Sequence, residues 1–127
     1  MTRVLFVGQR PETVDFSDPA IPPGFNAEKI HAGISIGMAK MAERGWQADL
    51  CLIPPDKTAG LLLEQQLATT TYECVVIGGG IRLPPKSLSL LETVVNTVHK
   101  AAPNAFIAFN TRPEDTAEAA ARWLEAD

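Results

Sequence analysis

Apolar residues follow two patterns along the chain: short continuous runs, and stripes that recur every three or four positions. Continuous runs of roughly four to eight residues, rich in β-branched side chains, are typical of strands covered on both faces. The clearest run is Cys74-Val75-Val76-Ile77, which leads directly into Gly78-Gly79-Gly80. The runs predict strands at residues 4–7, 48–53, 74–77 and 105–109.

Stripes at helical spacing separate these runs and predict helices at about residues 27–44, 57–69, 87–101 and 113–124. In the first helix the apolar side chains recur at steps of four, four and three, and so form one face; they are Ile30, Ile34, Met38 and Met41. Asn26 is suited to cap this helix. Ser89 with Glu92, and Thr111 with Glu114, have the spacing of capping boxes in the later helices.

Two glycines, Gly33 and Gly37, interrupt the first predicted helix one turn apart. Each costs about 1 kcal/mol of helix stability relative to alanine, which suggests that another segment packs closely against them. The candidates are the central strand and a second subunit, and we favour the central strand.

The order of these elements is a strand followed by a helix, four times over. Such alternation predicts a parallel sheet with helices on both faces, joined by right-handed crossovers. We therefore predict a single α/β domain over residues 1–127, a three-layer α/β/α sandwich. Its four-stranded parallel sheet has the order 2-1-3-4, as in flavodoxin-like proteins with the fifth strand absent.

Composition and charge exclude several classes of partner. The 127 residues carry a net charge of -4, from 11 Lys and Arg against 15 Asp and Glu, and no basic run marks a surface for nucleic acid or for anionic membranes. No apolar segment is long enough for a membrane span or a signal peptide. Cys51 and Cys74 lie inside predicted strands, so we interpret them as reduced core residues of a cytoplasmic protein.

In open parallel sheets, ligands bind beyond the carboxyl ends of the strands, where the strand order reverses. Here that point lies between the first and third strands, at two loops. The loop of residues 9–26 is unusually long and proline-rich, as in lids and binding loops. The loop of residues 78–86 begins with the glycines, which suit either a tight turn or a close approach to a ligand.

Three of the arginines, Arg10, Arg82 and Arg112, follow the first, third and fourth strands by two to five residues. Guanidinium groups match carboxylate and phosphate oxygens, so this edge predicts a small anionic ligand. The alternative is that Arg10 and Arg82 pair with carboxylates of the long loop. The predicted ligand-binding residues are Gln9, Arg10, Gly79, Gly80, Arg82, Asn110, Thr111 and Arg112.

Other titratable residues give weaker predictions. His31, near the start of the first helix, could be an acid or base, as could Glu12, with Asn110 as an orienting group. A partly buried His31 bonded to a loop carbonyl is the commoner arrangement. Asp15 and Asp18 fit Asx turns better than a metal site. We predict neither a metal nor a cofactor.

The fold pattern is similar to that of flavodoxins, response-regulator receivers, phosphocarrier domains and low-molecular-weight phosphatases. The first loop, Gly8-Gln9-Arg10-Pro11-Glu12-Thr13, has neither a hydroxyl-rich phosphate loop nor a nucleophilic cysteine, and Gly78 stands where a receiver has its phosphoacceptor aspartate. Stretches 14–19, 80–85 and 110–115 resemble small bacterial proteins of uncharacterised activity, and this resemblance adds no mechanism.

The leading hypothesis is therefore a cytoplasmic domain that binds a small carboxylate- or phosphate-bearing molecule at the carboxyl edge, with the loop of residues 9–26 closing over it. Catalysis is left open. The alternative is a regulatory or protein-interaction module without catalytic activity, either a monomer or a homodimer, whose functional surface is an exposed apolar patch.

Overall fold

The structure, a computed structural model, describes residues 1–125 and contains one four-stranded parallel sheet. The strands are β1 (Arg3–Gln9), β2 (Gln47–Ile53), β3 (Cys74–Ile77) and β4 (Phe106–Phe109). Their order is β2-β1-β3-β4, and each pair of neighbours is parallel. The predicted α/β class and the strand order 2-1-3-4 are therefore confirmed.

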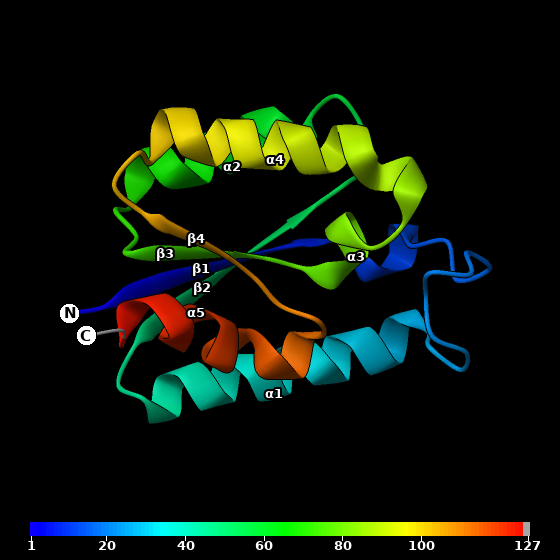
Figure 1. Ribbon diagram of the computed structural model, residues 1–127, viewed down its shortest axis with the longest axis horizontal. Coiled ribbons are helices and arrows are strands. Elements are labelled where there is room, and N and C mark those ends of the chain that lie inside the picture. The colour runs from blue at the N-terminus through cyan, green and yellow to red at the C-terminus, as the bar shows by residue number, and fades with distance from the viewer. Residues whose placement is uncertain (126–127) are drawn as a thin grey trace.

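Helices cover both faces of the sheet (Figure 1). The helices are α1 (Ala27–Glu43), α2 (Ala59–Thr69), α3 (Gly79–Arg82), α4 (Leu88–Ala101) and α5 (Thr116–Leu124). The side chains of β1 alternate between the two layers: Leu5 and Val7 pack towards α2 and α4, whereas Val4 and Phe6 pack towards α1 and α5. This period of two gives one apolar core on each side of the sheet.

Helix ends differ from the sequence interpretation where short turns precede the helices. Residues 85–87 form a 3-10 turn, so α4 begins at Leu88 and Ser89 lies inside it. The Ser89 carbonyl accepts from Thr93 Oγ1 at 2.9 Å, and the predicted capping box with Glu92 is wrong. The Asn26 cap is confirmed, since its Oδ1 accepts from the Lys29 amide at 2.8 Å.

The second predicted capping box, Thr111 with Glu114, is also wrong. The carboxylate that closes this turn belongs to Asp115, which accepts from the Thr111 amide at 3.0 Å and from the Thr111 hydroxyl. Residues Pro113–Asp115 form a 3-10 turn, η3, immediately before α5.

The glycines of α1 pack against η3, not against the central strand as the sequence suggested. A Cβ on Gly37 would come within 3.0 Å of the Pro113 carbonyl oxygen, and a Cβ on Gly33 would lie 2.8 Å from Glu114 Oε1. The reason is that α1 and α5 lie side by side on one face, so the turn that leads into α5 crosses α1 (Figure 1).

Both cysteines are free and buried, as predicted. Burial raises the pKa of Cys74 to about 12 and raises that of Cys51, so both stay thiols at neutral pH. Within residues 1–125, no helix is both long enough and apolar enough to cross a membrane.

Candidate functional site

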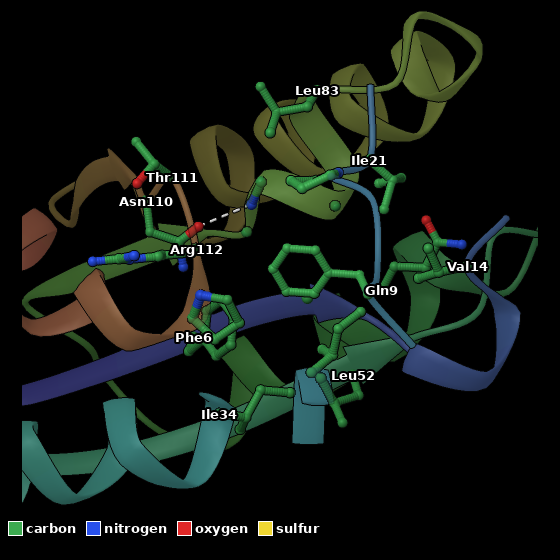
Figure 2. A pocket seen from close by; sticks show the side chains of 18 residues that line it. Phe6, Gln9, Val14, Ile21, Ile34, Leu52, Leu83, Asn110, Thr111 and Arg112 are labelled. Atoms are coloured by element: carbon green, nitrogen blue, oxygen red, sulfur yellow. Dashed lines mark hydrogen bonds between the residues drawn. The ribbon is translucent and has the colours of Figure 1, made fainter. Parts of the chain in front are cut away.

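A pocket of about 270 Å³ opens beyond the carboxyl ends of β1 and β3. This is the point where the strand order reverses, since β2 lies on one side of β1 and β3 on the other. Figure 2 shows Phe6, Ile34 and Leu52 on one side of the pocket and Leu83 and Thr111 on the opposite side. The pocket therefore lies between the sheet, α1 and the segments that follow β3 and β4.

The lining is largely apolar. The elements of the fold contribute Phe6 from β1, Leu52 from β2 and Ile34 from α1. The long loop adds Val14 and Ile21, which close the pocket on a further side (Figure 2). These apolar residues were not among the predicted site residues, because that prediction rested on the charged side chains at this edge. The signal in the sequence that could have identified them is the presence of apolar side chains in a loop that is otherwise polar and proline-rich.

The loop of residues 9–26 has more local structure than the sequence indicated. Pro11–Thr13 form a 3-10 turn, η1, and Gln9 Nε2 donates to the Thr13 carbonyl at 3.0 Å. Asp15 Oδ1 accepts from the Ser17 amide at 3.0 Å, and Asp18 Oδ1 accepts from the Ala20 amide at 2.9 Å. Asx turns at both aspartates, as predicted, shape the loop that covers the pocket.

Lys86 holds this loop from the opposite side of the site. Its Nζ bonds to Asp15 Oδ2 and lies 3.7 Å from Asp18 Oδ2. The hydrogen bond from Lys86 lowers the pKa of Asp15 to about 2, and the same bond raises the pKa of Lys86. The alternative in which Arg10 or Arg82 would pair with the loop is therefore wrong, because Lys86 takes that position. Exposed pairs of this kind contribute little individually, so the loop is held loosely.

The two candidate acid/base residues are brought together. Glu12 Oε2 and His31 Nε2 are 2.6 Å apart, both exposed, and they join η1 to α1. The hydrogen bond to His31 is the main reason why the pKa of Glu12 is lowered. The expected partly buried His31 bonded to a loop carbonyl is wrong. Neither residue lines the pocket.

The glycine run leads into a helical turn, α3, at the start of the loop predicted over residues 78–86. A Cβ on Gly79 would lie 3.0 Å from the Thr111 carbonyl oxygen, so this residue must be small for the segments after β3 and β4 to meet. The Gly79 amide donates to Asn110 Oδ1 at 2.9 Å, and Asn110 Nδ2 donates to Thr116 Oγ1 at 3.0 Å. Asn110 is only 1% exposed and so fixes one wall of the pocket.

The predicted site residues fall into two groups. Those that line the pocket are Gln9, Gly79, Gly80, Asn110, Thr111 and Arg112. Arg10 and Arg82 do not line it. Arg82 lies behind the wall, where its Nη2 donates to the Asn110 carbonyl at 2.9 Å, and Arg10 is exposed. The three arginines therefore do not converge, and of the three only Arg112, which is exposed, belongs to the lining.

Within residues 1–125, no cluster of three or more His, Cys, Asp or Glu side chains could hold a metal ion. Comparison with known protein families and with curated proteins finds no match to the chain. The fold and the pocket are thus the basis for any functional conclusion.

Proposed function

We propose that this domain binds a small molecule that has an apolar body and one terminal carboxylate or phosphate group. The observation that carries the proposal is a largely apolar pocket at the carboxyl edge with an exposed arginine, Arg112, on its rim. Ligand pockets typically combine an apolar lining with a few polar groups that orient the ligand. Gln9 and Thr111 are further polar residues of the lining.

The volume limits the size of the ligand. At about 270 Å³ the pocket is slightly below the range of roughly 300–1,000 Å³ that drug-sized ligands occupy. A short branched or aromatic acid, or its phosphate ester, fits this volume better than a nucleotide does. The apolar body would contact Phe6, Ile34 and Leu52, and the charged end would face the rim.

The arrangement supports binding better than catalysis. Both ends of the Asn110 side chain are already bonded to the protein, to the Gly79 amide and to Thr116 Oγ1. Glu12 and His31 bond to each other outside the lining. An acid or base must reach the proton it transfers, and neither of these side chains faces the bound molecule in this geometry.

The test is thermal unfolding of the purified protein with a panel of small acids, phosphate esters and the matching neutral amides or alcohols. A ligand at one hundred times its dissociation constant adds about 2.7 kcal/mol to the free energy of unfolding, which raises Tm by several degrees. We expect shifts from apolar acids or esters and smaller shifts from their neutral counterparts.

Variants distinguish the pocket from nonspecific binding. Arg112→Ala removes the rim charge and should weaken binding of the acid at least tenfold. Arg10→Ala removes an exposed arginine outside the lining and should leave the affinity for the acid unchanged. Val14→Trp should fill the pocket from the loop and abolish binding. If the acid bound Arg112→Ala as tightly as Arg10→Ala, the role of the charge would be refuted. Binding that survives Val14→Trp would refute the pocket.

A further inference from the structure

The edge strand β4 begins and ends with an exposed aromatic side chain, and a third belongs to α5. Phe106 is 49% exposed, Phe109 36% and the α5 residue Trp123 47%, and the rings of Phe106 and Trp123 stack with centroids 6.3 Å apart. Figure 1 shows β4 along the sheet between α4 and α5. Natural edge strands are often very short, or carry a lysine, a proline or a bulge, and each of these features hinders pairing with another chain. β4 is short, with four residues. The sequence Phe-Ile-Ala-Phe of β4 has neither lysine nor proline.

The backbone of β4 offers a defined set of groups to a partner. The amides of Phe106 and Asn110 bond to β3, at 3.0 Å to the Glu73 carbonyl and 3.2 Å to the Ile77 carbonyl. Because successive residues of a strand direct these groups to alternate sides, the groups of residues 105, 107 and 109 face away from β3.

Two of these outward groups are already bonded inside the chain. The Ala105 amide donates to the Ala102 carbonyl at 3.1 Å, and the Phe109 carbonyl accepts from Arg122 Nη2 at 2.9 Å. The outward groups that find no partner within residues 1–125 are the Ala105 carbonyl, the Ile107 amide and carbonyl, and the Phe109 amide.

We propose that β4 pairs antiparallel with β4 of a second copy of this chain, about a two-fold axis through Ile107. In this register the two Ile107 residues exchange both backbone bonds, and each Phe109 amide donates to Ala105 of the other copy. The Ala105 amide and the Phe109 carbonyl, which would otherwise face each other, are the two groups already satisfied. Every outward group of the pair thus has a partner.

The side chains fit the same register. Phe109 lies opposite Ala105 of the second copy on one face, and Phe106 lies opposite Ala108 on the other. A large ring therefore meets an alanine at each position, and Ile107 meets Ile107. A two-fold interface requires such self-complementarity, which an unrelated partner would not need. The occupant is therefore a second copy, and the two sheets would form one sheet of doubled width.

The first experiment measures the mass of the full chain in solution by light scattering and sedimentation over a range of concentrations. We expect a dimer that Phe106→Lys converts to a monomer, because the two introduced charges lie near the axis. Leu61→Lys is the matched control, since Leu61 on α2 is 57% exposed but distant from β4, and it should stay dimeric. Circular dichroism checks that both variants fold.

A second variant tests the register directly. Residues opposite each other at a hydrogen-bonded position have Cα atoms about 5.5 Å apart, within reach of a disulfide. Ile107→Cys should therefore give a covalent dimer on mild oxidation, whereas Leu61→Cys should not, and the buried Cys51 and Cys74 do not compete. A wild-type monomer at all concentrations, a dimer unaffected by Phe106→Lys, or no crosslink in Ile107→Cys would overturn the proposal.

Discussion

Replacement of Gly37 by alanine tests the packing of α1 against the turn before α5. In an unconstrained helix this substitution stabilises by about 1 kcal/mol, because alanine loses less backbone entropy than glycine. Here the new Cβ would come within 3.0 Å of the Pro113 carbonyl oxygen, which is backbone and cannot rotate away. The helix and the turn must therefore separate.

The size of the effect follows from two costs. Overpacking of a close contact typically costs 1–3 kcal/mol. Movement of the Pro113 carbonyl also strains its 2.7 Å bond from the Thr116 hydroxyl, and a partly buried hydrogen bond of this kind contributes about 1 kcal/mol. Against these stands the gain of about 1 kcal/mol in helix propensity. We expect Gly37→Ala to lower the free energy of unfolding by about 2 kcal/mol.

Gly33→Ala is the matched control, one turn earlier on the same helix. Its Cβ would meet the Glu114 carboxylate, the end of a flexible side chain that can move aside. We expect this variant to be between neutral and about 1 kcal/mol more stable than the wild type. Urea unfolding measures both, with the slope m unchanged, and Gly37→Ala should also lower Tm by roughly 8 °C. A Gly37→Ala protein as stable as Gly33→Ala would refute the close contact.

Four further predictions follow from the site and the core. Gly79→Ala should destabilise the protein, because its Cβ would press on the Thr111 carbonyl oxygen. Gly80→Ala has open space around its Cβ and should stabilise the protein by about 0.4–1 kcal/mol, and urea unfolding measures both variants. The bond from Lys86 lowers the pKa of the Asp15 carboxyl from 3.8 to about 2, so the stabilisation from this bond is present above pH 3.8 and is lost as the pH falls towards 2. Asp15→Asn should lack this step when the free energy of unfolding is measured against pH, and a profile identical to that of the wild type would contradict the bond. With its pKa at about 12, Cys74 should resist thiol reagents at pH 8 until urea unfolds the chain, and rapid labelling of the native protein would contradict its burial. Thr116→Val should lower the free energy of unfolding by about 1–3 kcal/mol and speed hydrogen exchange of the Gly79 amide, whereas Thr116→Ser should keep that amide protected. Equal protection of the Gly79 amide in both variants would show that the Thr116 hydroxyl does not hold the pocket wall.

The sheet could be predicted from sequence because its signals are local and strong. Four apolar runs alternate with four helical stripes, and the right-handed crossover rule leaves few possible strand orders. The Asn26 cap and the two core cysteines were predictable for the same reason, since a cap depends on three neighbouring residues and a buried thiol on its own strand.

The partners across the fold were not predictable in this way. Gly33 and Gly37 indicated a close neighbour, but only the arrangement of α1 beside α5 shows that it is η3. The arginines gave a similar difficulty: their positions after the strands brought them to one edge, yet the direction of each side chain depends on the local turn. Arg82 is at the end of the helical turn α3 and so bonds to the Asn110 carbonyl behind the pocket wall.

The same atoms that limit helix packing also position the pocket. The Pro113 carbonyl contacts Gly37 on one side and accepts from the Thr116 hydroxyl, which in turn accepts from Asn110. Asn110 then holds the Gly79 amide, at the start of the helical turn that forms one wall. Because these contacts are continuous, a displacement at α1 would reach the wall of the pocket although Gly37 itself does not line it. The affinity for the proposed small acid should therefore fall in Gly37→Ala together with the free energy of unfolding.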